Sequence, residues 1–295
     1  MWLILLLLIF IMTGCGTSES TSETTDKEDA DKLQIGLSFD SFVIERWLRD
    51  RDMFVSTAQG LNAEVNVQVA GGEVEEQISQ IEYFIQKKMD VIVIIPIDGD
   101  ALYDVVKEAQ AAGISVVCYD RIIENVGADL YITIDNEKVG TLMGESLIQA
   151  CPDGGNIFAI YGSQTDHNVT EVKKGFTEAL KGSNLKIVYS DYCDNWLAEL
   201  AACQRIVEGT QYMTVYKPIE QEAATAATLA VALAKGEDIT SADYDIPVTD
   251  TIIDGKKEIP YYKIEPVAVT AKNMDEVIID SGFHTREDVY LNIKN

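Results

Sequence analysis

Hydrophobic positions from residue 33 onward follow two alternating patterns. Short runs rich in β-branched residues predict strands, and longer segments with apolar residues three and four positions apart predict helices. In residues 73–88, for example, Ile78, Ile81 and Ile85 share one helical face, whereas VIVIIP at 91–96 is typical of a parallel strand covered on both sides. The predicted strands are 33–39, 64–70, 91–96, 114–120 and 130–135, and the helices between them end near residues 61, 88 and 113.

The same alternation starts again after residue 135. A predicted helix (136–150), strand (156–162), helix (168–181) and strand (185–191) follow one another. Strands that alternate with helices indicate a doubly wound parallel sheet, so two such runs predict an α/β protein of two lobes. No G-x-G-x-x-G or Walker pattern is present, and we therefore expect no nucleotide or other cofactor.

The first 32 residues have a different character. Residues 2–12 form an unbroken apolar run that ends in Thr13-Gly14-Cys15, which is typical of a bacterial lipoprotein signal with Cys15 as the acylated residue. An ordinary secretory signal with an incidental cysteine is the alternative. Residues 16–32 contain no aromatic or branched aliphatic side chain and predict a disordered acidic tether. Residues 1–15 and 16–32 together predict an extracytoplasmic protein that a lipid anchors to the cell membrane, in the periplasm or on the outer face of a Gram-positive membrane.

Charge and cysteine content exclude several classes of partner. The formal net charge of −26 disfavours nucleic acids and anionic membrane surfaces, because both repel an acidic protein. The sequence has two histidines and no C-x-x-C pair, so we expect no metal site.

Polar residues gather where the predicted strands end, which is the edge at which parallel sheets bind ligands. Carboxylates, amides and an arginine suit a neutral polyhydroxy ligand, because each hydroxyl both donates and accepts hydrogen bonds. Simpler interpretations exist. Asp120 or Asp135 could cap the next helix, Trp47 could be a core aromatic, and the charged residues 45–52 could form a solvated helix face. The residues at or just beyond the strand ends are Asp40, Asp98, Asp120, Arg121, Asp135, Asn136, Asp166 and Asn168.

Taken in order, three motifs resemble the type I periplasmic sugar-binding protein family of bacterial ABC transporters, and most closely its D-xylose-binding branch. The motifs are E-R-W at 45–47, Y-D-R at 119–121 and T-V-Y-K-P at 214–218. The resemblance implies a non-enzymatic protein that captures a pentose such as D-xylose by cleft closure and delivers it to a membrane permease. By the family pattern, the sugar contacts are Arg46, Trp47, Asp120, Arg121, Asp166, Asn168, Trp196 and Lys217.

The family pattern also implies the domain organisation. An N-terminal lobe would comprise residues 33–135 plus 217–263 and a C-terminal lobe residues 136–216 plus 264–295. Three chain crossings near residues 134–136, 216–218 and 262–266 would form the hinge between them.

The second lobe departs from the family. Residues 194–211 pass directly from Trp196 to a helix that should follow two further strands, so two βα units of about 30 residues each are missing. We therefore predict an incomplete second lobe. Alternative functions are a sugar-sensing input protein for a chemoreceptor or membrane kinase, a truncated relative that binds nothing, and a hydrolase or isomerase that uses Asp120, Asp135 and His167.

Overall fold

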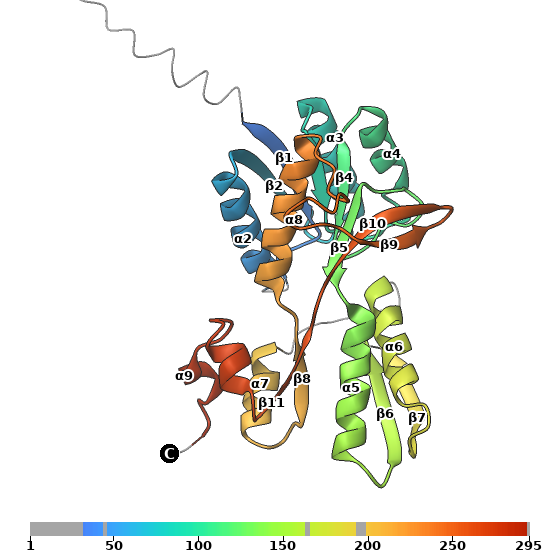
Figure 1. Cartoon of the computed structure of the whole chain (residues 1–295), viewed down its shortest axis with the longest axis vertical. Coiled ribbons are helices and arrows are strands. Elements are labelled where there is room, and N and C mark those ends of the chain that lie inside the picture. Colours follow the sequence, from blue (N-terminus) through green and yellow to red (C-terminus); the bar gives the residue numbers. More distant parts are fainter. Residues whose placement is uncertain (1–31, 44–45, 163–165, 193–198, 294–295) are drawn as a thin grey trace, which may run out of the picture. The chain divides into compact units, whose positions relative to one another are not determined.

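The computed structural model describes residues 32–43, 46–162, 166–192 and 199–293 (Figure 1). Cys15, the predicted signal and nearly all of the predicted tether lie outside the described residues. Within the described ranges, no helix is long and apolar enough to cross a membrane. The strands are β1 (Leu33–Phe39), β2 (Ala63–Val69), β3 (Val91–Ile94), β4 (Ser115–Tyr119), β5 (Leu130–Ile134), β6 (Gly155–Tyr161), β7 (Leu185–Tyr192), β8 (Met213–Tyr216), β9 (Asp250–Asp254), β10 (Lys257–Ile264) and β11 (Val267–Thr270). The helices are α2 (Arg46–Gly60), α3 (Val74–Lys87), α4 (Tyr103–Ala111), α5 (Asn136–Ala150), α6 (His167–Ala179), α7 (Glu199–Val207), α8 (Ile219–Ala234), the π-helical turn η1 (Asp275–Ile279) and α9 (Arg286–Val289).

A seven-stranded sheet organises the larger part of the chain, which we call the first lobe. Its strand order is β2-β1-β3-β4-β5-β10-β9, and every pair is parallel except β10 with β9. All four residues of β3 are buried, as expected for a central strand covered on both faces. The carboxyl ends of these parallel strands meet at one edge, and this edge carries the candidate site.

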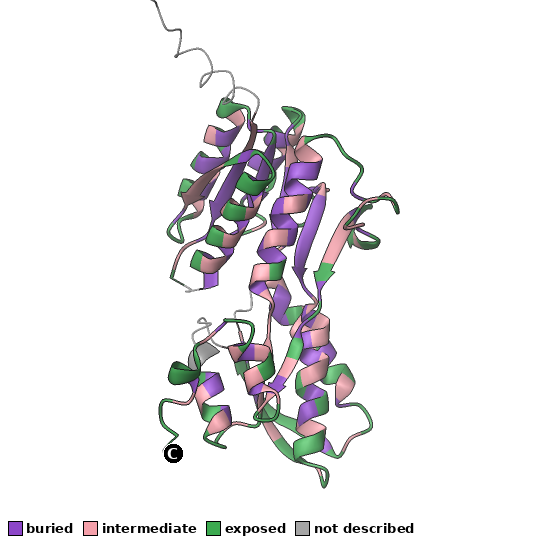
Figure 2. Cartoon of the chain, turned by 60° about the vertical axis from the view of Figure 1, so that its left-hand side comes forward, coloured by how far each residue is buried: buried purple, intermediate pink, exposed green. Residues whose placement is uncertain are grey.

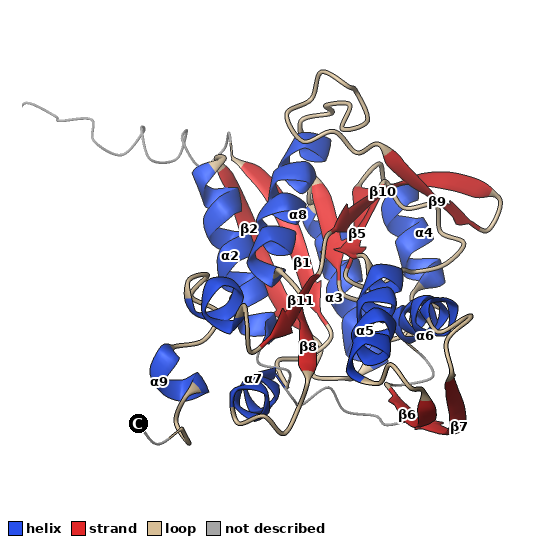
Figure 3. Cartoon of the chain, turned by 60° about the horizontal axis from the view of Figure 1, so that its bottom comes forward, coloured by secondary structure: helices blue, strands red, loops and turns tan. Residues whose placement is uncertain are grey.

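Helices cover both faces of this sheet (Figure 3). On one face, Trp47 and Phe54 of α2 and the alanine-rich side of α8 pack against alternate residues of the strands. On the other face, Ile81 and Phe84 of α3 and the apolar side of α4 form a second core cluster. The small residues of α8 let its backbone approach the sheet closely, so α8 is buried along much of its length.

Two elements of the first lobe differ from the sequence prediction of five strands separated by helices. Residues 120–129 join β4 to β5 without a helix. The sheet also gains β9 and β10, a hairpin that the alternation of strands and helices did not reveal. Gly255 takes a φ of 63° at the first central position of its two-residue loop, where a type II′ turn requires a positive φ.

The remaining elements form a smaller second lobe that contains two separate two-stranded sheets. β6 pairs with β7 in parallel, and β8 pairs with β11 in antiparallel. The chain passes between the elements of the large sheet and those of the smaller sheets at 134–136, 216–219 and 264–267. The strands β1, β3, β4 and β5 of the large sheet are mostly buried, whereas exposed residues run along β6 and β7 (Figure 2). Phe158, Ile160 and Tyr189 are 75%, 63% and 52% exposed, which is consistent with the loss of covering elements.

Close packing of α5 against α6 supports the β6–β7 sheet. A Cβ on Gly140 would lie 1.9 Å from the carbonyl oxygen of Val172, and one on Gly175 would lie 1.8 Å from that of Glu137. Only glycine permits this approach of the two helix backbones. Leu147 of α5 and Phe176 of α6 pack with Ile157 of β6 and Leu185 of β7, so the helix pair covers part of this small sheet.

We expect Gly140→Ala to destabilise the second lobe. The added methyl group meets backbone rather than a movable side chain, so the free energy of unfolding should fall by about 2–3 kcal/mol or more. Gly60→Ala, at the end of α2, is the control, because nothing lies within 4 Å of the added Cβ. Urea unfolding followed by circular dichroism measures both. Equal stability of the two variants would contradict the packing argument.

Candidate ligand-binding site

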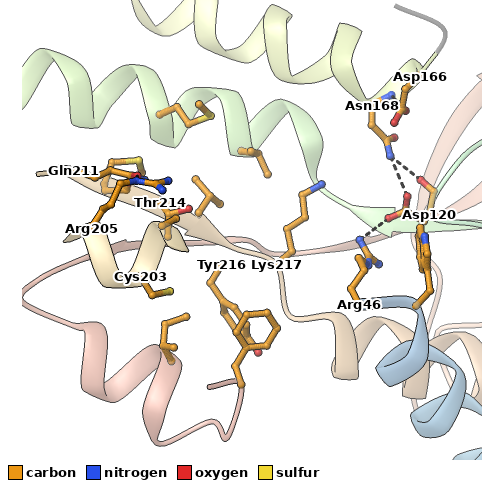
Figure 4. Close-up of a pocket in the computed structure, with 18 of the residues that line it drawn as sticks. Arg46, Asp120, Asp166, Asn168, Cys203, Arg205, Gln211, Thr214, Tyr216 and Lys217 are labelled. Atoms are coloured by element: carbon orange, nitrogen blue, oxygen red, sulfur yellow. Dashed lines mark hydrogen bonds and ion pairs between the residues drawn. The ribbon is translucent and has the colours of Figure 1, made fainter. Parts of the chain in front are cut away.

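A cavity of about 500 Å³ lies at the carboxyl edge of the large sheet and extends along α5, α7 and β8 (Figure 4). Arg46, Asp120, Asp166 and Asn168 gather at one end of it, Arg205 and Gln211 lie at the other, and Lys217 lies between. Trp196 lies outside the described residues. The other seven predicted contacts all line this cavity: Arg46, Trp47, Asp120, Arg121, Asp166, Asn168 and Lys217.

Arg46 is the first residue of α2 and is almost fully buried. Its Nε and Nη2 donate to the two oxygens of Asp50 at 3.3 and 3.0 Å. Nη1 donates to Asp120 at 3.0 Å, and Nη2 also donates to Glu222 at 3.0 Å. Four of its five N–H groups therefore bind carboxyl groups, and one Nη1 donor has no acceptor among the described residues.

Asp120 follows β4 and turns the chain with a φ of 61°, a conformation that few residues other than glycine, Asn and Asp adopt readily. Its carboxylate accepts from Arg46 and, at 3.3 Å, from the side-chain amide of Asn168. Burial alone would raise the pKa of Asp120, but the charges of Arg46, Lys217 and Arg121 lower it below its usual range. Asp120 is therefore an ionised acceptor, and the interpretation of Asp120 as a helix cap is wrong because no helix follows it.

Arg121 points its guanidinium toward the cavity and uses only one of its nitrogens for hydrogen bonds. Nη1 donates to Asp40 at 2.8 Å and to the carbonyl of Pro96 at 3.2 Å. Nε lies 3.8 Å from Asp166, too far for a hydrogen bond, and among the described residues it has no hydrogen-bond acceptor although it is buried. In the part of the chain that the structure describes, neither Nε nor Nη2 of Arg121 makes a hydrogen bond.

Trp47 is buried in the core and also lines the cavity. Its ring is 1% exposed and packs edge-on against Phe39 in the core. The same ring lines the cavity, with the guanidinium carbons of Arg46 and Arg121 4.3 and 5.8 Å from its centroid. Its indole N–H is buried and finds no acceptor within the described ranges. A ligand oxygen could accept from it, because buried donors are rarely left unpaired.

The start of α6 brings two further predicted residues to the site. Asp166 caps this helix by accepting from the backbone N–H of Asn168 at 2.9 Å. The side-chain amide of Asn168 donates to the carbonyl of Asp120 at 3.1 Å, in addition to the carboxylate. Asp135 caps α5 through the backbone N–H of Lys138, so for this residue the capping interpretation is correct.

Lys217 lies between β8 and α8 and donates to the side-chain oxygen of Asn136 at 3.1 Å. Asn136 begins α5, so this hydrogen bond joins two of the three chain crossings. Lys217 therefore connects the site to the hinge.

Three carboxylates of the site were not among the predicted contacts. Asp40 follows a predicted strand and could have been chosen on that signal. Asp50 lies one helical turn after Arg46, but the run of charges around it suggested a solvated face, whereas Arg46 and Asp50 are 8% and 1% exposed. Glu222 is fully buried in an alanine-rich helix, and no local sequence signal distinguishes it.

Apolar side chains line much of the rest of the cavity, including Val139 and Met143 of α5, Val215 of β8, and Phe283. An apolar wall with a few convergent polar groups is the usual composition of a small-molecule site. In the described part of the chain, no group of three or more His, Cys, Asp and Glu residues could hold a metal ion.

Comparisons with known proteins agree with this architecture. The periplasmic binding protein domain family matches residues 35–202. The D-xylose-binding periplasmic protein of Haemophilus influenzae is 37% identical, with 95% of this chain and 98% of that protein covered. The protein of the same name from Escherichia coli is 35% identical, with 88% and 93% covered. An ABC transporter solute-binding protein from Clostridium phytofermentans, solved with bound β-D-glucose, has a TM-score of 0.75 at 25% identity, with 87% and 99% covered.

This chain therefore belongs to the periplasmic sugar-binding protein family, which is non-enzymatic, and has its type I α/β fold. The fold class predicted from the sequence is confirmed. The alignment with the Haemophilus protein spans 336 positions, but 95% of the 295 residues is only about 280. About 56 positions of that relative, the difference between 336 and 280, thus have no counterpart here, close to the size of two βα units.

We expect Asp120→Asn to lower stability at neutral pH and to lose this effect in acid. A depressed pKa in the folded state stabilises the protein above the usual aspartate pKa, and this stabilisation disappears as the pH falls through the folded-state value. Loss of the charge opposite Arg46 should cost about 3–5 kcal/mol at pH 7. Urea midpoints at pH 7 and pH 3 measure the difference, with exposed Asp52→Asn as the neutral control. A difference in urea midpoint between wild type and Asp120→Asn that is equally large at pH 7 and pH 3 would contradict a depressed pKa of Asp120.

Proposed function

We propose that this chain is the solute-binding protein of a sugar ABC transporter, that it captures D-xylose or a similar pentose outside the cytoplasm, and that it delivers the sugar to a membrane permease. The observation that carries the proposal is one cavity that brings together donor side chains, among them Arg46 and Arg121, and the acceptors Asp120 and Asp166. The names of the two xylose-binding relatives support the choice of sugar.

The chemistry of a pentose suits this arrangement. Adjacent hydroxyls can accept from the Nε–Nη2 edge of Arg121 and donate to carboxylates, so each hydroxyl is satisfied in both directions. Asp166 and Asn168 come from α6, whereas Arg46 and Asp120 come from the first lobe.

A ligand that contacts both the start of α6 and the first lobe favours the state in which the lobes are closed around it. It can shift the equilibrium only by its differential affinity for that state, so contacts from both lobes are required. We propose that the permease recognises the closed form. The lobe boundaries 33–135 plus 217–263 and 136–216 plus 264–295 belong to this proposal.

The missing positions favour one alternative, a truncated relative that does not bind sugar. About 56 positions of the Haemophilus relative have no counterpart in this chain, and the two small sheets of the second lobe do not join. Contacts that the absent units would make to a sugar are lost with them. The titration with D-xylose described next decides between a sugar-binding protein and a truncated relative that does not bind sugar.

We expect isothermal titration of the purified chain with D-xylose to give saturable binding. Arg121→Lys keeps the charge but loses the fork, so its Kd should rise about tenfold or more, equivalent to about 1–2 kcal/mol. Arg51→Lys is the matched control, because Arg51 pairs with exposed Asp52 outside the cavity. No heat with xylose, ribose or arabinose for a folded wild-type chain would establish the non-binding alternative. Equal Kd values for Arg121→Lys and wild type would remove Arg121 from the site.

We propose that Cys15 carries a lipid anchor and that residues 16–32 act as the tether. Cys15→Ser should move the protein from the membrane fraction to the soluble extracytoplasmic fraction. Two acyl chains hold a protein firmly, so the wild-type chain should remain with membranes after a high-salt wash. Cys151→Ser, which changes an exposed cysteine of the second lobe, serves as the control. A soluble wild-type chain would exclude the anchor.

A further inference from the structure

Arg46 is surrounded by three buried carboxyl groups. Asp50, Asp120 and Glu222 each place an oxygen 3.0 Å from its guanidinium nitrogens, and all three are almost completely buried. They come from three elements, α2, the end of β4 and α8. Asp50 also accepts a hydrogen bond from the hydroxyl of buried Tyr119.

Glu222 differs from the other two carboxylates in its surroundings. It is 0% exposed, and within the described part of the chain its Oε1 has no hydrogen-bond donor. Its only hydrogen-bond contact there is Oε2 with Nη2 of Arg46 at 3.0 Å. An ionised carboxylate in such a place would be costly. Burial raises the pKa of Glu222 well above its usual range, although Arg46 opposes this effect.

Two neighbouring carboxyl groups act in the same direction as burial on the pKa of Glu222. Arg46 already faces Asp50 and the ionised Asp120, so a third negative charge would meet repulsion from both. A neutral acid can still accept from Nη2 through its carbonyl oxygen. The titratable and charged groups that face Glu222 are Arg46 and Asp50 from α2, Tyr119 and Asp120 from β4, and Lys217 from the segment before α8.

We propose that Glu222 is a positioning residue of the sugar site, which holds the Arg46 guanidinium so that Nη1 stays on Asp120 and its remaining donor stays directed at the ligand. This inference rests on the proposed function. Glu222 does not line the cavity and acts through Arg46.

The geometry gives the reason for this role. Asp50 holds the Nε–Nη2 edge of Arg46 from its own helix, and Asp120 holds Nη1 from the end of β4. Glu222 accepts the second hydrogen of Nη2 from α8, so the guanidinium is also held from a third element. Because α8 begins two residues after Lys217, the same helix positions two of the predicted sugar contacts.

Three substitutions and one control test the proposal by calorimetry with D-xylose. Glu222→Leu removes the acceptor, and the Kd should rise about tenfold. Glu222→Asp withdraws the oxygen by one methylene and should raise the Kd at least threefold. Glu222→Gln keeps a neutral acceptor of the same length and should stay within about threefold of wild type. Thr225→Val, a buried near-isosteric change one turn along α8, is the control and should leave the Kd unchanged.

A second measurement needs no sugar. In protein labelled with 15N-arginine, the Nη protons of a held guanidinium exchange slowly and give separate signals, which Arg46→Lys identifies by their loss. We expect these signals in wild type and Glu222→Gln, and their broadening in Glu222→Leu and Glu222→Asp.

The outcomes separate the two proposals. If wild type binds no pentose, the proposed function fails, whereas the Arg46 signals still report whether Glu222 positions the guanidinium. Unchanged Kd values and sharp Arg46 signals in Glu222→Asp would overturn the inference even if Glu222→Leu did not fold. A Glu222→Gln variant as impaired as Glu222→Asp would also overturn it, because the charge rather than a neutral acceptor would then be required.

Discussion

A buried arginine held by three carboxylates is the interaction on which the candidate site depends. Arg46, Asp50, Asp120 and Glu222 meet where α2, β4 and α8 converge, so the cluster ties together three elements that are distant in the sequence. Removal of one partner from a buried ion pair costs about 3–5 kcal/mol, because the remaining charge is left in a medium of low polarity. The cluster therefore has one stable arrangement, and Asp120 takes its position from it.

The polar groups of the site fall into two kinds. Some are already paired within the protein, as Asp120 is with Arg46 and with the amide of Asn168. Others, the Nε of Arg121 and the indole N–H of Trp47, have no acceptor in the described chain. A ligand gains most from the second kind, because it satisfies donors that are costly to leave buried. Its contacts with groups that are already paired, such as Asp120, replace existing hydrogen bonds. These contacts contribute mainly to geometry and specificity.

The two lobes differ in how they are stabilised. The first has a seven-stranded sheet between two helical layers, with a continuous core on each face. The second has two small sheets that do not join, and the glycine-mediated contact of α5 with α6 holds one of them. Regions with few buried apolar contacts open at lower free energy than a large core. Any ligand-induced closure would therefore bring together a stable first lobe and a less stable second lobe.

The sequence determined the strands and helices of the first lobe, and it placed Asp120 and Arg121 at a strand end, because these features depend on local periodicity and on the common edge of parallel strands. Tertiary structure alone decided the role of Glu222. It lies in an alanine-rich helix beside Glu220, and only the packing of α8 against α2 buries one of these two glutamates on Arg46. The hairpin β9–β10 had a local turn signal at Gly255, but its place beside β5 rests on pairing across more than 100 residues. Local patterns cannot encode such contacts, because burial and strand pairing depend on which distant surfaces meet.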